Sequence, residues 1–533
     1  MSNDKLSPEP SPGARPAPDH DSHRSLIRST SILSLGTLSS RILGFLRDIV
    51  LARLLGTGLR ADAFFVALKI PNLFRDMVGE GATNAAVVPV LAEYHHKERE
   101  QFWNFVNIVL SLALMILSLI TLAGVLGAPL IVRVIAPGFL ADPVKLDLTI
   151  RLTKVMFPYL ILIGLTSYSM GILYTFRSFL VPAFTPCLLN IAIITSALLA
   201  SRSMAEPVYG LAVGVLIGGV LQLVFQIPAM TRIGFRWRPP ASLRHPGATK
   251  IGRLLVPRMI GSGVYQMTVL IDTFCASLAT IVGAGGISAI YYANRIIQFP
   301  MGIFSVAMAS ALLPSLSAMA NKKDHEGIKN TLIFFLENIF FVMFPTTIML
   351  LFLSEPIIRV LFERGEFGGY STRITAWALT CYSIGLFSFG GIKILVTAFH
   401  SLQDTKTPVK VAGICLAINA VLNFVLMHPL KVGGIALASA VAGTVDFLVL
   451  FAIMNSRLGG LRAGLLTYSV RVAMASLLTG GMLHWCWQNI VIPNEFLKLI
   501  LLGSAGYVFY GMFSLAFGIN QAKRIWNYIK YGS

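Results

Sequence analysis

Residues 108–132 read IVLSLALMILSLITLAGVLGAPLIV and contain no ionisable side chain. A helix needs about 20 consecutive apolar residues to cross a bilayer. Residues 334–353 form a second such run, in which Glu337 is the only charge. Over all 533 residues the chain is 55% hydrophobic and 13% charged, whereas soluble proteins average about 25% charged residues. The sequence therefore predicts an all-α polytopic membrane protein.

About 14 segments have the length and hydrophobicity of membrane-spanning helices. Their approximate limits are 27–55, 62–92, 103–134, 147–174, 182–201, 207–230, 254–282, 286–318, 328–353, 372–398, 409–428, 433–455, 466–488 and 497–518.

An internal repeat divides these segments into two halves. Residues 62–70, DAFFVALKI, resemble residues 288–296, SAIYYANRI, at an offset of 226. Three further matches have nearly the same offset: Pro89 with Pro314, Phe176 with Phe399, and Gly138 with Gly365. Such a repeat predicts two lobes of six helices each, followed by two extra helices. Because six is even, both lobes have the same orientation, and a site is expected between them near the membrane midplane.

The repeat and the charge distribution predict five regions. These are a disordered cytoplasmic tail at 1–26, an N-lobe of helices 1–6 at 27–231, a basic cytoplasmic linker at 232–253, a C-lobe of helices 7–12 at 254–456, and helices 13–14 with a basic C-terminal tail at 457–533.

The net charge of +19 is concentrated in the two tails, the linker and the connections after helices 8 and 10. Lys and Arg mark the cytoplasmic side of membrane proteins, so both termini are predicted to be cytoplasmic. Arg359 and Arg364, after helix 9, are exceptions. No segment offers the soluble basic face with stacking aromatic residues that nucleic-acid binding needs. The acidic headgroups of membrane lipids are the expected partners of the remaining charge.

Ionised residues also lie inside predicted helices 1 and 2. They are Arg41, Arg47, Asp48, Asp62, Lys69, Arg75, Asp76 and Glu80. A charge at bilayer depth costs roughly 2.5–3.5 kcal/mol, so such residues usually face a bundle interior and mark a site for a polar or charged solute. The alternative is that they are structural ion pairs that close one helix on another.

The spacing of these charges favours an anion site. Residues seven apart share a helix face, which places Arg41 with Asp48 and Asp62 with Lys69. Arg295 has no acid near it in sequence, and its repeat partner Lys69 is also basic. Two bases from opposite lobes suit an anion between them, and arginine suits phosphate because its guanidinium donates two parallel hydrogen bonds.

A second group of residues is a candidate metal site. Asn419 and Asn423 lie four apart on one face of helix 11, and Asp272 lies on helix 7. Carboxylate and amide oxygens suit a hard cation such as sodium. The alternative is hydrogen bonding between helices by the two asparagines.

Sequence signatures of catalysis are missing from the chain. It has no GxxxxGK[ST] motif for ATP hydrolysis. It also has no Ser/His/Asp or Cys/His pattern for covalent catalysis. The chain is therefore predicted not to be an enzyme.

Several of these segments resemble the MurJ/MviN lipid II flippase family. The most specific is residues 40–48, SRILGFLRD. The others are 62–65 (DAFF), 71–75 (PNLFR), 89–94 (PVLAEY), 157–159 (FPY), 291–295 (YYANR), 312–316 (LLPSL) and 404–408 (DTKTP). The resemblance runs in order from about residue 30 to the end.

The resemblance implies the fourteen-helix fold of the multidrug/oligosaccharidyl-lipid/polysaccharide flippase superfamily, with a cationic cavity between two lobes and a lipid-tail groove on helices 13 and 14. The implied activity moves undecaprenyl-pyrophosphate-linked disaccharide-pentapeptide from the inner to the outer leaflet of the bacterial cytoplasmic (inner) membrane, by alternating access. This transport would supply peptidoglycan and cell wall synthesis. The implied partners are this substrate, membrane lipids and cell-wall synthesis or division proteins, with the chain acting as a monomer.

The family's substrate-binding positions fall on five residues: Arg41, Arg47, Asp62, Arg75 and Arg295. Asp48 and Lys69 are secondary candidates. No cofactor is implied as required, but some members bind sodium between helices 7, 11 and 12, which corresponds to Asp272, Asn419 and Asn423. The sequence departs from some relatives in having Asn294 in place of Asp and Asp76 in place of a second base.

Three other functions fit parts of the sequence. A flippase for another lipid-linked glycan would need the same pyrophosphate site. A cation-coupled multidrug exporter of the same superfamily would need an acidic or aromatic cavity, which the basic residues argue against. A non-transporting membrane scaffold would not need the buried charges.

Overall fold

The computed structural model describes residues 20–78, 82–97 and 100–531, which are almost entirely helical. The first half contains α1 (His20–Leu55), α2 (Leu59–Val78), α3 (Ala82–Lys97), α4 (Phe102–Ile135), the 3-10 turn η1 (Pro137–Ala141), α5 (Pro143–Met156), α6 (Tyr159–Thr175), α7 (Leu180–Ser203) and α8 (Pro207–Arg232).

The second half repeats this pattern. It contains α9 (Pro246–Ser277), α10 (Ala279–Val282), α11 (Gly286–Pro300), the π-helical turn η2 (Met301–Ser305), α12 (Val306–Asn321), α13 (His325–Phe362), α14 (Gly369–Ser383), α15 (Leu386–Ser401), α16 (Lys406–Leu430) and α17 (Val432–Leu458). The chain then adds α18 (Arg462–Asn489), α19 (Glu495–Ala516) and the short α20 (Asn520–Tyr531).

These helices follow the fourteen predicted segments in order, and several segments are broken into two helices. The fourth segment breaks between α5 and α6, next to Pro158, and the tenth bends by 47° between α14 and α15. These two segments correspond in the repeat. By length and composition, nine helices among the described residues can cross a membrane, or ten if the bent pair is one span.

The first helix begins earlier than predicted. Residues 1–19 of the predicted disordered tail lie outside the described residues, but α1 already includes residues 20–26. Pro18 is the last proline of the tail. A proline disfavours helical conformation in the residue before it. Residues 19–26 contain no proline, so the helix can begin before residue 27.

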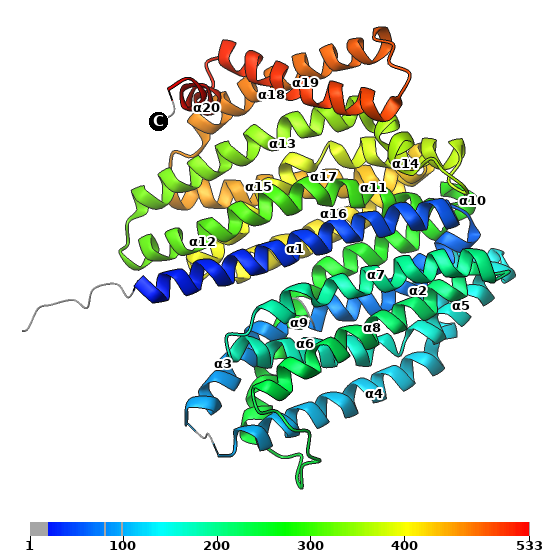
Figure 1. The fold of residues 1–533 in the computed structure, drawn as a ribbon. Coiled ribbons are helices and arrows are strands. Elements are labelled where there is room, and N and C mark those ends of the chain that lie inside the picture. The colour runs from blue at the N-terminus through cyan, green and yellow to red at the C-terminus, as the bar shows by residue number, and fades with distance from the viewer. Residues whose placement is uncertain (1–19, 79–81, 98–99, 532–533) are drawn as a thin grey trace, which may run out of the picture.

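The lobes lie side by side, and the last helices cover one flank (Figure 1). In the N-lobe α7 packs against α1 and α8, and in the C-lobe α16 packs against α17. The last two long helices, α18 and α19, pack on α13. The first turns of α1 and the last helix, α20, lie on the side of the molecule opposite α10 (Figure 1).

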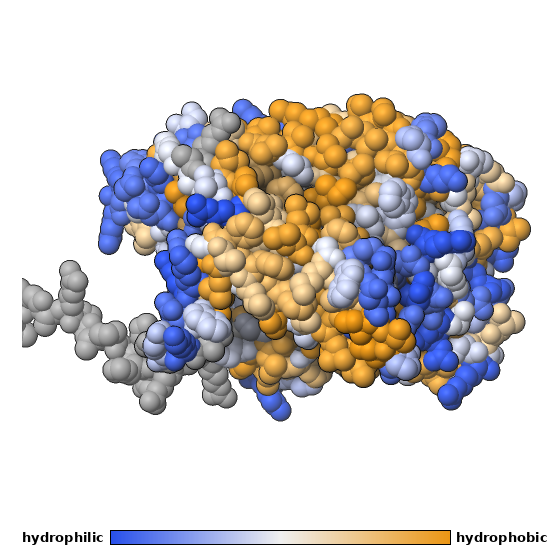
Figure 2. All heavy atoms as spheres, turned by 90° about the horizontal axis from the view of Figure 1, so that it is seen from above, coloured by the Kyte–Doolittle hydropathy of each residue, from blue (hydrophilic) through white to orange (hydrophobic). Residues whose placement is uncertain are grey.

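The outer surface has the character of a membrane protein. Figure 2 shows a broad hydrophobic band over the flank formed by α18 and α19, with hydrophilic residues gathered toward its two ends. Large apolar side chains are exposed here, including Leu466, Leu477, Trp485, Val508 and Met512. Apolar patches of this extent mark surfaces that contact membrane or protein.

Candidate functional site

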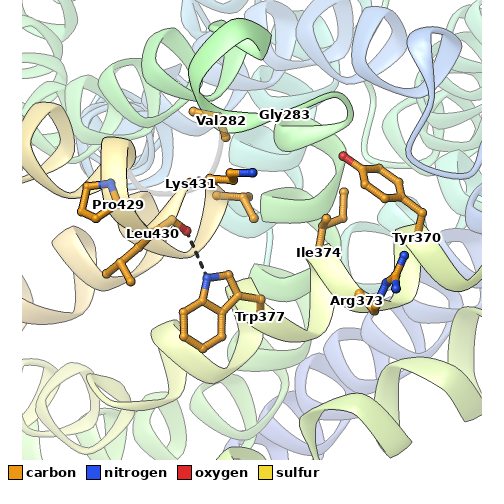
Figure 3. Close-up of a pocket in the computed structure, with 10 residues that line it drawn as sticks. Val282, Gly283, Tyr370, Arg373, Ile374, Trp377, Pro429, Leu430 and Lys431 are labelled. Carbon is orange, nitrogen blue, oxygen red and sulfur yellow. Dashed lines mark hydrogen bonds between the residues drawn. The ribbon is translucent and has the colours of Figure 1, made fainter.

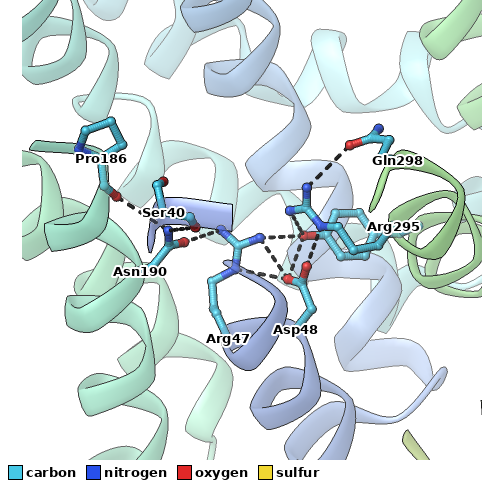
Figure 4. Close-up of polar contacts among 8 residues, drawn as sticks. Ser40, Arg47, Asp48, Pro186, Asn190, Arg295 and Gln298 are labelled. Atoms are coloured by element: carbon cyan, nitrogen blue, oxygen red, sulfur yellow. Dashed lines mark hydrogen bonds and ion pairs between the residues drawn. The ribbon is translucent and has the colours of Figure 1, made fainter. Parts of the chain in front are cut away.

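The predicted charges of helix 1 meet helix α11 of the other lobe at a buried carboxylate. Asp48 of α1 is fully buried, and its Oδ1 lies 2.8 Å from Nη2 of Arg47. Arg295 of α11 donates from Nε to the other oxygen, Oδ2. The hydroxyl of Tyr291 donates to Oδ1 at 3.0 Å. Asp48 therefore bridges two arginines that belong to different lobes (Figure 4).

The two arginines are held differently. Arg47 also donates to Oδ1 of Asn190 on α7 at 3.1 Å and to the Tyr291 hydroxyl at 3.0 Å. Its side chain is 9% exposed. The side chain of Arg295 is 32% exposed, and its Nη1 reaches Gln298 at 3.5 Å (Figure 4). Arg47 is thus held by hydrogen bonds on several sides, whereas part of the Arg295 guanidinium is exposed and can contact a ligand.

The pairing of these charges differs from what spacing along one helix suggests. Arg41 and Asp48 share a face of α1, and no acid lies near Arg295 in sequence, but in the structure Asp48 pairs with Arg47 and Arg295. The spacing argument considered one helix alone, whereas the partner of Arg295 lies 247 residues away. Sequence reasoning also missed Asn190 and Tyr291, although Tyr291 lies in the segment 291–295 that carries part of the family resemblance.

Arg41 lies against the backbone of the opposite lobe. A Cβ atom on Gly302 of η2 would be 1.7 Å from Nη1 of Arg41, so the guanidinium occupies the space of a missing side chain. Arg41 is half-buried, and within the described part of the chain it forms no ion pair or hydrogen bond. It is therefore a cation on α1, about two turns before Asp48, with its hydrogen-bond donors available.

Asp62 is fully engaged in a contact between the lobes. Its Oδ2 pairs with Lys145 of α5 at 2.7 Å, and its Oδ1 accepts from the backbone N–H of Ser288 at 2.9 Å and from the Ser288 hydroxyl. The predicted helix-face partner, Lys69, is not involved. Lys145 was missed because the fourth span was predicted to begin at 147, which assigned this lysine to a connection.

Lys69 makes the contact that corresponds to Arg295. Its Nζ donates to Oγ1 of Thr273 on α9 at 2.6 Å. Lys69 and Arg295 are repeat partners, and the equivalent contacts of Arg53 and Ser277 place Asp272 at the repeat position of Asp48. The two interfaces between lobes, α1–α11 and α2–α9, are thus equivalent, but Asp48 is bonded to Arg295, whereas Asp272 is bonded to Asn423 and Ser439 and Lys69 to Thr273.

Repeat partners also touch one another. Asp62 contacts Ser288, and the ring of Phe65 stacks on Tyr291 with centroids 3.9 Å apart. Both pairs have the repeat offset of 226. Contacts between equivalent residues occur where a twofold axis passes through an interface. The axis between the lobes therefore runs beside α2 and α11, close to the charged cluster.

Arg75 completes the predicted substrate residues. It is half-buried in the last turn of α2, after Pro71, and it is not without an interaction partner. The side chains of Asp76 and Glu80 lie outside the described residues.

The lobes are closed at the end of the molecule near α10. The N–H of Gly138 donates to the Ser277 hydroxyl at 3.1 Å, and the N–H of Glu366 donates to the Arg53 carbonyl at 3.0 Å. A Cβ on Gly138 would lie 2.0 Å from the Ser277 carbonyl oxygen, and one on Gly365 would lie 2.4 Å from that of Arg53. Gly138 and Gly365 are repeat partners, so the two lobes use equivalent glycines to bring their backbones together.

The candidate metal residues converge as predicted. Asp272 of α9 accepts from Nδ2 of Asn423 at 2.8 Å and from the hydroxyl of Ser439 on α17 at 3.0 Å. Asn419 accepts from Asn423 and donates to Ser439, each at 3.1 Å. Ser439 was not predicted. Oδ1 of Asn423 is buried without a hydrogen-bond partner, so this oxygen-rich group can accept a small hard cation.

An apolar pocket lies between α13, α17 and α18. Its volume is about 390 Å³. Its walls include Phe340, Phe447, Phe451 and Leu466. It lies beside the added helix α18, near the groove implied on helices 13 and 14, and its walls suit a hydrocarbon chain.

The fold is similar to that of an inward-facing multidrug resistance MATE family transporter of the MOP superfamily, with a TM-score of 0.68 and 16% identity over 79% of this chain and 95% of that chain. Two such lobes around buried charges define a polytopic membrane protein with this fold. A solved lipid II flippase MurJ in an inward closed conformation has a TM-score of 0.77 and 27% identity over 91% of this chain and 98% of that chain.

The family model described as lipid II flippase MurJ matches residues 51–504. The lipid II flippase MurJ of Burkholderia cenocepacia is 35% identical over 87% of this chain and 90% of that protein. The probable lipid II flippase MurJ of Vibrio cholerae is 34% identical over 91% of this chain and 95% of that protein. The chain belongs to the MurJ family of lipid II flippases, whose members are transporters of the bacterial inner membrane.

Proposed function

We propose that this protein moves lipid II, an undecaprenyl-pyrophosphate-linked disaccharide-pentapeptide, from the inner to the outer leaflet for cell wall synthesis. The observation that carries the proposal is the shared carboxylate of Asp48, which joins Arg47 and Arg295 across the lobes, with the free donors of Arg41 about two turns earlier on α1. Two guanidinium groups share this one carboxylate and a third follows along the same helix, which leaves an excess of positive charge, as a pyrophosphate requires.

Competition for the arginines couples binding to movement of the lobes. When a pyrophosphate enters beside Arg41, its oxygens replace those of Asp48 as the hydrogen-bond acceptors of Arg295. The Arg295–Asp48 pair is one of the contacts that join the lobes, so a ligand that takes Arg295 changes the relative stability of the closed and open states. A ligand shifts such an equilibrium only through its different affinity for the two states.

The isoprenoid tail remains outside the charged centre. The pocket between α13, α17 and α18 is lined mainly by phenylalanine and leucine side chains, and α18 also contributes to the hydrophobic flank seen in Figure 2. We propose that part of the tail lies there while the headgroup occupies the space between the lobes.

We also propose that a sodium ion binds at Asp272, Asn419, Asn423 and Ser439. A bound cation would supply positive charge beside Asp272 and thereby affect the neighbouring Thr273, which holds Lys69 of the other lobe. The side chains of this group would otherwise hold α9 against α16 and α17 by hydrogen bonds alone.

The positive charge distribution supports an orientation with both termini in the cytoplasm. Arg359 breaks the rule in sequence, but it pairs with Glu355 and lies 3.7 Å from both Glu363 and Glu495. Its charge is therefore compensated locally. In this orientation the glycine contacts near α10 close the outer end. The site uses both lobes of one chain, so a monomer suffices.

The test is complementation of a bacterium depleted of its own lipid II flippase. We expect the wild-type chain to restore growth and Arg41→Ala and Arg295→Glu variants of equal abundance to fail. Flux of labelled lipid II in reconstituted vesicles, compared with a labelled O-antigen lipid, separates lipid II transport from transport of another lipid-linked glycan. Normal lipid II flux by Arg295→Glu would refute the role of the arginines.

A further inference from the structure

A second cationic pocket lies at the end of the C-lobe near α10, away from the charged centre. Its volume is about 350 Å³. Its walls come from the connection after α10, the first turns of α14 and the junction of α16 with α17 (Figure 3). This pocket takes no part in the function proposed above.

Two cations line this pocket with their donors available. Arg373 of α14 and Lys431 between α16 and α17 are both exposed. Among the residues that the structure describes, neither forms an ion pair or a side-chain hydrogen bond. The helix α17 begins directly after Lys431 and has no side-chain cap, so its first N–H groups add positive partial charge at the same place.

The aromatic residues of the pocket have their polar atoms turned to the protein. Nε1 of Trp377 donates to the Leu430 carbonyl at 3.0 Å (Figure 3), and the Tyr370 hydroxyl donates to the Ala284 carbonyl at 2.9 Å. The first bond joins α14 to α16, and the second joins α14 to the turn after α10, so both hold the walls in place. The rings themselves remain as apolar walls beside the two cations.

The backbone at Lys431 supports a specific role for its side chain. Lys431 has φ of +53° and ψ of −129°, a backbone conformation that residues other than glycine rarely adopt. Such strain persists only where the surrounding structure imposes it, and it occurs preferentially at functional sites. A glycine here would avoid the strain but would remove one of the two cations.

The surface next to the pocket selects the source of the anion. One to two turns before the pocket, α16 exposes Val421, Phe424 and Val425, of which Val421 is 63% exposed. This surface faces hydrocarbon in a membrane. A free anion would gain nothing from it, whereas the acyl chains of a phospholipid would lie along it while the phosphate reaches the cations.

We infer that this pocket binds the phosphate headgroup of an anionic phospholipid, with Arg373 and Lys431 on the phosphate and Trp377 and Tyr370 beside the glycerol. Trp and Tyr are typical of the membrane–water interface. In the orientation proposed above, the lipid belongs to the outer leaflet.

The inference is tested by native mass spectrometry of the full-length protein. Phosphatidylglycerol is titrated against phosphatidylcholine, and we expect selective retention of phosphatidylglycerol by the wild type. The exposed-residue variants Arg373→Gln and Lys431→Gln should each weaken this binding about tenfold, since each removes a charged hydrogen bond. Arg133→Gln is the matched control, because Arg133 is exposed at the same end of the N-lobe.

Separate arms with inorganic phosphate and a polyprenyl pyrophosphate identify the source. Displacement of phosphatidylglycerol by millimolar phosphate, or preference for the polyprenyl lipid, would overturn the assignment to a phospholipid. Equal retention by the control and by both pocket variants would overturn the site itself. None of these results depends on flipping, so they are distinguishable from a failure of the proposed transport.

Discussion

Asp48 is the residue on which the α1–α11 contact depends. We expect Asp48→Asn to leave two arginines next to each other without a shared carboxylate. Removing one partner of a buried ion pair typically costs about 3–5 kcal/mol, and the lower end applies because Arg295 is about one-third exposed. The unfolding midpoint of the purified protein measures this loss.

The control for Asp48→Asn is Asp147→Asn, which removes an exposed ion pair with Arg151. Exposed pairs contribute little to stability, so this variant should unfold like the wild type. Equal stability of the two variants would show that Asp48 does not hold the lobes together.

Gly302 determines where Arg41 can lie. In Gly302→Ala the new methyl group would overlap the guanidinium, which is the flexible end of its side chain and can move. We therefore expect a normal unfolding midpoint but reduced lipid II flux in vesicles. Gly413→Ala on α16 is the control, because a Cβ there meets open space. Unchanged flux in Gly302→Ala would mean that the position of Arg41 does not matter for transport.

At the scale of elements, Asp404 stabilises the start of α16. Its carboxylate accepts from the N–H groups of Lys406 and Thr407 and from Arg457 of α17 at 2.7 Å. Bonds from the Thr407 hydroxyl and backbone, together with Arg457, lower the pKa of Asp404. A lowered pKa means that the carboxylate stabilises the fold above its unfolded pKa of about 3.9 and loses this effect only as the pH falls through the folded value.

We expect Asp404→Asn to speed amide exchange in the first turn of α16, with the same difference from the wild type at every pH from about 5 to 8. Glu326→Gln on α13, an exposed residue 3.7 Å from Lys329, is the control. A difference that disappears within this pH range would contradict the assignment.

The candidate cation site links three helices and predicts a salt effect. If sodium binds there, the wild type should unfold at a higher temperature in sodium chloride than in potassium chloride. At ten times the dissociation constant the stabilisation is about 1.4 kcal/mol. Asp272→Asn should abolish the difference between the two salts, and Asp147→Asn should keep it. A wild type that unfolds identically in both salts would refute sodium binding.

The elements show what sequence reasoning could reach. Apolar runs and the offset of 226 are properties of the chain itself, so the spans and the two lobes were predictable. Asp272, Asn419 and Asn423 were grouped correctly because each is a polar residue in an otherwise apolar span. The partner of Arg295 was not predictable, because pairing across the lobes depends on their packing and not on spacing within one helix. The same holds for Lys145 and for the contact of Arg41 with Gly302.

For the whole molecule, the glycine contacts near α10 determine which end is closed. In Gly138→Ala the new Cβ would meet the Ser277 carbonyl, a backbone atom that cannot rotate away. We expect this change to separate the lobes at this end. A cysteine placed at the buried Ser371, which contacts Thr57 across the lobes, should then react faster with an impermeant maleimide added outside cells.

The five native cysteines are buried, so the introduced one dominates labelling. Gly368→Ala is the control, since it lies at the same end and a Cβ there has open space. Slow labelling in both variants would show that the glycine contact does not keep this end shut.

The different partners of Asp48 and Asp272 have a consequence for the direction from which a substrate enters. Two equivalent seams, α1–α11 and α2–α9, join the lobes, with Asp48 on α1 and Asp272 on α9. Asp48 is bonded to arginines of both lobes, whereas Asp272 is bonded to Asn423 and Ser439 of its own lobe and Lys69 to a hydroxyl. Only the first seam therefore presents arginines to an amphipathic molecule, whose orientation relative to the protein is determined when its charged end binds there, before the lobes move.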